Sequence, residues 1–288
     1  MKHVIGIIFI FGLVIMACSG KNPVSPIEAT DEEAIYNVLF QDNYRITAFD
    51  FFKIAIPDTA AFLANPDPNN PCIWHDVQYT SENLVITILD NPVQSPVGLV
   101  MEGHVTYTIN DTGKFRIIMY NSAADSIERD SVKFNLTMTR SATCQQWGRT
   151  NTIRRGWLLT SISDARVSGG QNYPFLSGLR YSSVTHADTS FVYGTHEPGE
   201  MLKFSPSEEI SIRYQTPDSL DKVFIYIPSN NYGYRLATPQ KDSLGVWRAT
   251  FTMPSVNIYG QLFFYVVNVG NFNQAYRASG YSFNYRIR

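Results

Sequence analysis

The sequence lacks the short motifs by which many enzyme classes are recognised. It has no Gly-x-Ser-x-Gly nucleophile turn, no phosphate-cradling Gly-Lys-Ser/Thr loop and no dinucleotide-binding glycine fingerprint. None of its five histidines is paired with another at the one-turn helical spacing of a zinc protease. We therefore assign no catalytic residue, no metal ligand and no cofactor from the sequence.

An excess of charge of either sign is also missing. Lysine and arginine together number 23 and aspartate and glutamate 25, so the formal net charge is -2, and the basic residues are scattered along the chain. A protein that binds nucleic acid needs a basic face to meet the phosphate backbone. We therefore expect no nucleic acid among the partners.

Cysteine is scarce, and only Cys18, Cys72 and Cys144 occur. In an oxidising compartment Cys72 and Cys144 could form one disulfide, but bridging requires α-carbons within about 7 Å, which spacing alone does not reveal. Cys72, His75 and Asp76 could also meet Cys144 as the four ligands of a structural zinc. We favour a disulfide or free thiols over the zinc site, and the choice between those two stays open.

The amino-terminal residues have the layout of a secretory signal. Lys2 and His3 form a basic start, and residues 4–17 form an apolar run that is shorter than the about 20 residues needed to cross a bilayer. The run ends in Ile15-Met16-Ala17-Cys18, which resembles the lipobox of bacterial lipoproteins. The alternative is an ordinary cleaved signal with a chance cysteine.

The lipobox resemblance implies a bacterial cell-envelope protein that is attached to a membrane by lipid on Cys18. Residues 1–17 would be the signal peptide, and residues 18–29, rich in proline and small polar side chains, would form a flexible tether. Several acyl chains anchor stably because each buried methylene contributes about 0.8 kcal/mol. Ser19, where retained lipoproteins carry Asp, implies the outer membrane if the cell is Gram-negative.

The segment of residues 30–167 begins with predicted helices. Thr30 and Glu33 fit a capping box at the start of a helix that runs to about Asn43. A second helical stretch is predicted at residues 47–54, and Asp58 is predicted to cap a short third helix.

Strands are predicted for the rest of this segment. Residues 84–89 form an apolar run, and residues 132–139 show the cleanest alternation of apolar and polar side chains in the chain. Asn110-Asp111-Thr112-Gly113 is predicted to be the turn of a hairpin. Helices followed by a long meander of strands is an α+β order.

The segment of residues 30–167 resembles the NTF2-like (cystatin-like) superfamily in its opening helices, its long hairpins and its closing strand, residues 155–164. The resemblance implies a cone in which a curved antiparallel sheet wraps the N-terminal helices, with an interior that could hold a ligand or a catalytic site. Its nearest candidate residues are Asp76, His104 and Tyr107. His104 and Tyr107 are an odd number of residues apart in one strand and should face opposite sides.

A change of composition marks the second half. Residues 168–197 are predicted to be a linker between domains. Residues 198–288 show short strands with regular turn signals, the spacing of an all-β sandwich, and residues 262–267 are predicted to form its most buried strand. This region resembles an immunoglobulin-like module of the bacterial extracellular kind, without the Cys…Trp…Cys signature of antibody domains.

Aromatic residues supply the remaining candidates. Trp74 in the first domain, and Tyr232 and Tyr234 in a predicted loop of the second, could stack on a sugar or anchor a protein partner. With Asp76 and His104 they make up our candidate contacts for a ligand or partner. Arg149, Arg154 and Arg155 flank a predicted turn and could meet an anionic partner such as lipid headgroups, or they could form a solvated hairpin tip.

Taken together, these features predict a non-catalytic cell-envelope lipoprotein that acts as a binding or scaffolding module. Its partner would be an envelope protein or a glycan. The alternatives are an envelope hydrolase or isomerase that uses the NTF2-like cone, and a carbohydrate-binding surface protein. An interior lined by titratable groups would favour the enzyme, whereas an interior filled by apolar side chains would favour the module.

Overall fold

Strands make up 61% of the residues that the structure describes, against 12% in helices. The computed structural model describes residues 28–47, 58–67, 71–170, 178–216, 221–228, 234–237, 239–256, 259–268 and 276–288. The predicted signal peptide, Cys18 and most of the predicted tether therefore lie outside the described residues.

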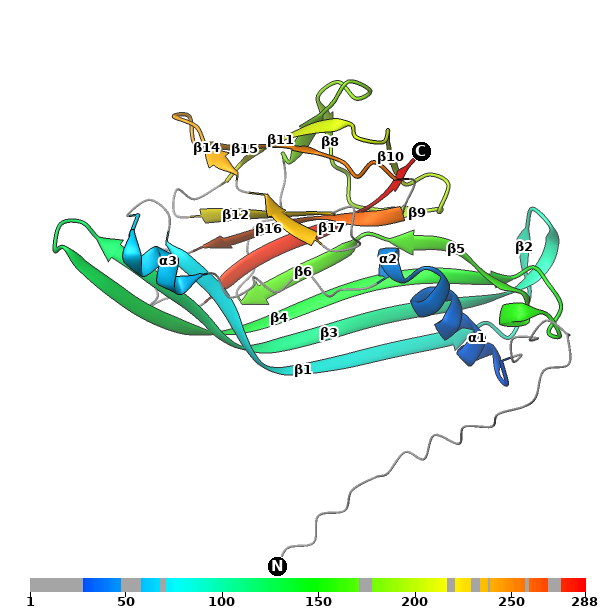
Figure 1. Ribbon diagram of the computed structural model, residues 1–288. Coiled ribbons are helices and arrows are strands. Elements are labelled where there is room, and N and C mark those ends of the chain that lie inside the picture. Colours follow the sequence, from blue (N-terminus) through cyan, green and yellow to red (C-terminus); the bar gives the residue numbers. More distant parts are fainter. Residues whose placement is uncertain are drawn as a thin grey trace, which may run out of the picture.

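The helices are short, and they lie at the two ends of the long strands (Figure 1). At one end, α1 (Asp31–Asn37), the π-helical turn η1 (Val38–Asp42) and α2 (Tyr44–Thr47) follow one another, and α3 (Thr59–Ala64) lies at the other end. The predicted capping box is confirmed, because Thr30 Oγ1 accepts a hydrogen bond from the Glu33 backbone N–H at 3.1 Å. Asp58 caps α3 as predicted, through a bond of 2.9 Å from the Ala61 N–H. Of the predicted helix at residues 47–54, all but Thr47 lies outside the described residues.

Three long antiparallel strands form the frame of the molecule: β1 (Cys72–Ile88), β3 (Gly98–Asn121) and β4 (Ser126–Gln146). The predicted strand at residues 132–139 is confirmed within β4, where Phe134, Leu136 and Met138 are buried on one face. The predicted hairpin turn at residues 110–113 is wrong, because β3 continues through it without a break.

The polar residues of the expected turn serve the sheet instead. The buried carboxylate of Asp111 accepts a hydrogen bond from Thr80 Oγ1 of β1, and Asn110 Oδ1 accepts one of 2.8 Å from Thr137 Oγ1 of β4. Gly113 faces a bulge in β1, where an added Cβ would lie 2.1 Å from the Asp76 carbonyl oxygen. Asn, Asp and Gly are thus required here by cross-strand contacts, although the same residue types are typical of turns.

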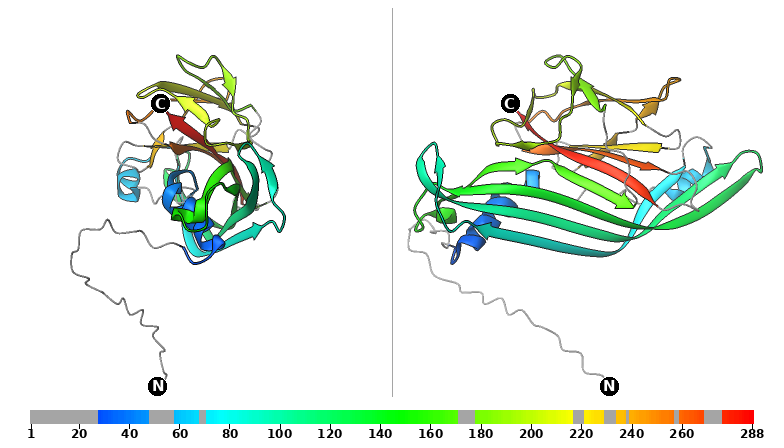
Figure 2. Two further views of the ribbon diagram at one scale, coloured as in Figure 1. Left: turned by 90° about the vertical axis from the view of Figure 1, so that its right-hand side faces the viewer. Right: turned by 180° about the vertical axis from the view of Figure 1, so that it is seen from behind.

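The long strands belong to a twelve-stranded sheet that also contains β2 (Val93–Ser95), β5 (Trp157–Ser163), β6 (Ala165–Gly170), β9 (Thr195–His196), β10 (Leu202–Phe204), β12 (Asp221–Pro228), β13 (Tyr234–Ala237), β16 (Tyr259–Asn268) and β17 (Arg277–Ile287). Its main path runs β1-β3-β4-β6-β17-β16-β12-β13. Figure 2 shows, in the end-on view, that this sheet curls. Its first strands therefore lie opposite β12 and β16 across a concave face.

A second sheet covers the outer face of β12, β16 and β17. It has the order β14-β15-β11-β7-β8 and consists of β7 (Arg180–Ser182), β8 (Thr189–Ser190), β11 (Glu209–Gln215), β14 (Gln240–Lys241) and β15 (Val246–Thr252). Buried residues of both sheets, including Tyr214, Phe251, Phe264 and Phe283, form the core between them. This two-sheet sandwich is compatible with the immunoglobulin-like character expected of the second half. The prediction that residues 262–267 are the most deeply buried matches β16, in which residues 260–267 are all buried.

The α+β cone expected of the first half is wrong, because the fold is all-β. The helical turns at the α1 end have seven, five and four residues, too few to line the concave face of strands as long as β3 and β4. Strands β12 and β16 cover that face instead. Residue 167, the expected domain boundary, lies inside β6, which pairs with β4 on one side and β17 on the other, so the sheet is continuous through this point.

Candidate functional site

The concave face of the large sheet is filled with side chains. Apolar residues from β1, β3 and β4 pack on residues of β12 and β16, among them Ile117, Phe134, Leu136, Phe263 and Val267. At the helical end, residues of α1 and η1 pack on Val105, Cys144 and Trp157. A deep ligand chamber of the kind expected inside a cone is absent from the described part of the molecule.

One polar cluster lies inside this apolar packing. His75 Nε2 lies 2.7 Å from the hydroxyl of Tyr276, which is hydrogen-bonded in turn to the hydroxyl of Tyr265. Burial lowers the pKa of His75 from 6.5 to about 3 and raises the pKa of both tyrosines. The imidazole is therefore neutral at physiological pH, and because the three side chains are at most 5% exposed the cluster contributes to packing.

Cys72 and Cys144 are both buried and free, so the structure does not form the disulfide that spacing had left open. Cys72 pairs with Ile118 of β3 and Cys144 with Gly103, 15 positions apart on the same strand, which is about 50 Å along it. Burial raises the pKa of the Cys144 thiol to about 12. Within the described residues, no group of three or more His, Cys, Asp or Glu side chains could hold a metal ion.

His104 and Tyr107 lie on opposite sides of β3, as their spacing predicts. The His104 side chain is 51% exposed and its Nε2 lies 3.0 Å from Glu102 Oε1, whereas Tyr107 packs edge-on against Phe40. Neither residue is among those that line the two grooves described below. Tyr232 lies outside the described residues, and the backbone of Tyr234 pairs with Pro228 at the start of β13.

Trp74 and Asp76 do come together, in what we call the distal groove, at the end of the sheet that carries α3. The two residues are two positions apart on β1 and share its outer face. The groove has a volume of about 500 Å³ and also contains Leu63, Arg116, Arg129 and Asp130. Arg116 forms an ion pair with Asp76, in which Nη2 and Nε of the guanidinium lie 2.6 Å and 2.7 Å from Asp76 Oδ2.

The distal groove combines an aromatic face with charged groups of both signs. A half-buried indole can stack on a flat or ring-shaped ligand, while guanidinium and carboxylate groups can bond to its polar substituents. Sequence reasoning found Trp74 and Asp76 but missed Arg116, Arg129 and Asp130. The pairing of β3 with β1 and β4 brings those three residues next to Trp74 and Asp76. This pairing could not be predicted from the sequence, because a hairpin turn was expected within β3.

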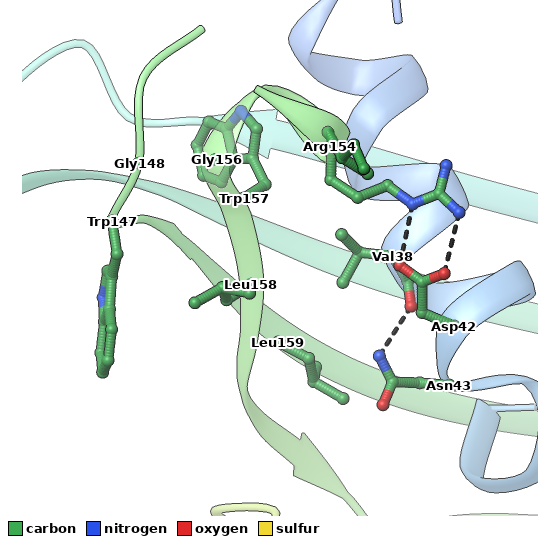
Figure 3. A pocket seen from close by; sticks show the side chains of 11 residues that line it. Val38, Asp42, Asn43, Trp147, Gly148, Arg154, Gly156, Trp157, Leu158 and Leu159 are labelled. Atoms are coloured by element: carbon green, nitrogen blue, oxygen red, sulfur yellow. Dashed lines mark hydrogen bonds and ion pairs between the residues drawn. The ribbon is translucent and has the colours of Figure 1, made fainter. Parts of the chain in front are cut away.

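A second groove, the proximal groove, lies at the α1 end, next to Glu28, the first described residue. It also has a volume of about 500 Å³, and its lining is mainly apolar, from Val38, Trp147, Ile153, Leu158 and Leu159. Figure 3 shows Trp147 on one side and an Arg154–Asp42 ion pair on the other, with the two leucines between them. Asp42 accepts two hydrogen bonds of 2.8 Å from Arg154, so the two side chains form an ion pair at the wall of the groove.

The turn beside the proximal groove is strained and firmly held. Within η2 (Ile153–Gly156), Arg154 and Arg155 have φ of 56° and 48°, which is costly for residues other than glycine. Gly156 also has positive φ, and an added Cβ would lie 2.4 Å from the Gly148 backbone. Arg154 binds Glu28 at 2.6 Å and Arg155 binds Asp31 at 2.7 Å, and these ion pairs stabilise the strained turn.

The electrostatics at this turn favour the ionised forms of Glu28 and Asp31. Burial, the largest single influence, would raise the pKa of Glu28, but the hydrogen bonds from Arg154 and Asn37, a backbone hydrogen bond and the charge of Arg154 together outweigh it, and the pKa is lowered. The same balance, with Arg155 and the Trp157 indole as donors, lowers the pKa of Asp31. Arg154 and Arg155 therefore both form ion pairs with carboxylates at the helical end of the molecule. Arg149, the third arginine predicted to flank this turn, is exposed and lies outside these ion pairs.

Comparisons with known proteins leave this chain without an assigned family. No family model matches the sequence, and no curated protein matches it. Among solved structures, the pullulanase from Bacillus acidopullulyticus is similar at a TM-score of 0.15 and 9% identity, over 67% of this chain and 28% of the pullulanase chain. A likeness at this TM-score carries no argument about fold or function. No helix among the described residues has the length and hydrophobicity to cross a bilayer.

Proposed function

We propose that this protein is a lipid-anchored, non-catalytic module of the bacterial cell envelope, held by acyl chains on Cys18 and acting through binding. The observation that carries this proposal is the filled concave face, where Phe134, Phe263 and their neighbours occupy the space that an enzyme of the NTF2-like kind would keep open. The titratable His75 cluster, which lies within this packing, is at most 5% exposed.

The distal groove is the binding surface that we propose for this module. It lies at the end of the sheet opposite α1, where the described chain begins, and the two ends are separated by most of the length of β3 (Figure 1). Trp74 beside the Asp76–Arg116 ion pair suits a polysaccharide of the envelope, because an indole stacks on the apolar face of a sugar ring and the charged groups bond to its hydroxyls.

Anchoring and binding can be tested on the same full-length protein produced in bacteria. We expect the wild type in the membrane fraction and the Cys18→Ser variant in the soluble fraction of the envelope. Soluble fragments of envelope polysaccharide should change the tryptophan fluorescence saturably, and Trp74→Ala should abolish that change. Trp147→Ala, at the opposite end, is the matched control and should preserve it.

Two results would contradict the proposal. Equal binding by the wild type and Trp74→Ala would remove the distal groove from the function. Release of product from the fragments, measured by chromatography under the same conditions, would instead support the alternative of an envelope hydrolase.

A further inference from the structure

Large apolar side chains are exposed at the end of the molecule where the described chain begins. We call this set the apolar tip: Val97, Leu99, Trp147, Ile153 and Leu158, which are 58%, 72%, 44%, 66% and 49% exposed. Leu99 lies two residues before Met101, which pairs with Gln146, so the β2–β3 hairpin is adjacent to the segment that carries Trp147. Both ribbon views place this hairpin, η2 and the start of α1 at one end of the sheet (Figures 1 and 2).

The described chain begins at this same end. Glu28, the first described residue, is bound to Arg154 beside the proximal groove through both its carboxylate oxygens. Ten positions separate Glu28 from Cys18, and an extended chain spans at most about 3.6 Å per residue, so the tether can reach no more than about 36 Å. A lipid on Cys18 therefore keeps the apolar tip close to the membrane surface.

The chemistry of the apolar tip suits the boundary between lipid headgroups and acyl chains. Tryptophan is enriched at that boundary because its ring is apolar and its N–H polar, while aliphatic side chains enter the acyl region. Arg149 is exposed two residues after Trp147 and can meet anionic headgroups. Arg154 and Arg155, fixed by Glu28, Asp42 and Asp31, hold the turn that presents Ile153.

We infer that the apolar tip inserts into the headgroup–acyl boundary of the leaflet that holds the anchor. The inference rests on the proposed lipidation of Cys18, because the short tether raises the effective concentration of the membrane at a surface that alone would bind it weakly. This seating orients the protein: the proximal groove faces lipid, and the distal groove points away from the membrane.

The test uses the full-length lipidated protein in vesicles of phosphatidylethanolamine and phosphatidylglycerol, with and without bromine on the acyl chains. Bromine quenches indole fluorescence only at short range. We expect quenching in the wild type, its loss in Trp147→Phe, and its retention in the matched control Trp74→Phe. Leu99→Ser should also reduce quenching, whereas Leu244→Ser, a 77% exposed leucine of the sandwich, should not.

Each other outcome overturns the inference in a recognisable way. Quenching that survives Trp147→Phe but is lost in Trp74→Phe would place the opposite end on the membrane. An emission of Trp147 that is already blue-shifted without vesicles, and unchanged by them, would mean that the tether or a second copy covers the proximal groove. If the protein is acylated but its fluorescence is not quenched, the apolar tip does not insert, and the proposal of an anchored module still stands. If mass spectrometry finds an amino-terminal peptide without acyl chains, both the anchoring and the insertion are wrong.

Discussion

The two faces of β16 and β17 are both buried, but they meet different neighbours. On the sandwich side, Leu262, Phe264 and Val266 of β16 and the aromatic residues of β17 belong to one apolar core. On the concave side, Phe263 and Val267 pack in the other apolar core. Beside them lies a polar part of the same side, which we call the polar face, where Gln261, Ser282 and Asn284 are buried and hydrogen-bonded. Alternation along a strand shows which face is apolar, but it does not show whether the polar face is in water or in a second core.

The polar face is organised around two charged side chains. Arg140 of β4, which is 3% exposed, donates hydrogen bonds to the Ile46 carbonyl, Gln261 Oε1 and Ser282 Oγ. Asp164, between β5 and β6, accepts bonds from the Asn284 N–H, the Gly194 N–H and His196 Nε2. These bonds connect β17 to α2 and β4 and to Gly194 and strand β9, so the polar face specifies how the two halves meet.

The largest loss of stability is expected from a substitution in the apolar core of the sandwich. Phe264→Ala should destabilise the protein by about 3–5 kcal/mol, because the ring is 1% exposed and packs edge-on against Tyr214 at 5.2 Å between centroids. Urea unfolding followed by circular dichroism measures this cost. The control Leu244→Ala, at an exposed turn, should change stability by no more than about 0.5 kcal/mol. Comparable losses in the two variants would mean that the sandwich core does not limit stability.

A slightly smaller loss of stability is expected from a substitution in the polar face. Arg140→Met keeps much of the side-chain volume but leaves the Ile46 carbonyl and the Gln261 side chain with fewer partners, and should cost about 2–4 kcal/mol. The same substitution at Arg213, whose ion pair with Asp188 is solvent-exposed, should cost no more than about 1 kcal/mol. A neutral Arg140→Met would show that the buried network contributes specificity rather than stability.

Acid should act on the concave side through His75. Its pKa is about 3 in the folded protein against 6.5 as the ordinary value, so between these values the unfolded chain binds more protons and stability falls as pH is lowered. From pH 7 to pH 5 the loss should be about 2 kcal/mol. Urea midpoints across this range measure it, and His75→Gln should flatten the slope. An unchanged slope in the variant would assign the acid sensitivity to other groups.

The smallest effect is expected at the edge of the polar face, and its sign is opposite. The hydrogen bond to Asp164 raises the pKa of His196 above 6.5 although burial acts against it. The stabilisation is therefore complete below about pH 6.5 and is lost as the pH rises through the raised value. Thermal unfolding of His196→Gln should show a weaker decline between neutral and mildly alkaline pH than the wild type; a steeper decline would contradict this sign.

The sequence predicted local structure better than it predicted the connections between strands. The caps at Thr30 and Asp58, the alternating strand within β4 and the deep burial of β16 follow from local chemistry, and the structure confirms them. The turn at residues 110–113 was wrong because its residues bond to neighbouring strands that a single chain segment does not reveal. The all-β fold was missed for the same reason, since β12 and β16 lie far along the chain from the strands they cover.

The candidate site was predictable in part. Trp74 and Asp76 share a face of one strand, a relation that spacing alone establishes, and both were selected as contacts. Their partners Arg116 and Arg129 depend on the register of β3 with β1 and β4, which the misplaced turn hid. The apolar tip was missed because Val97, Leu99, Trp147, Ile153 and Leu158 are scattered along the chain and meet only when the ends of the long strands and their connecting turns are brought together.

The position of β17 has a consequence for the order in which the protein can fold. β17 follows all its partners in the chain, yet it lies between β6 and β16 and pairs with both. Until β17 arrives, β6 and β16 each present an open edge that could pair with another molecule. Because the central pairing is so distant in sequence, we expect folding to be slow, and a chain that halts before residue 277 is a template for aggregation rather than a smaller folded protein.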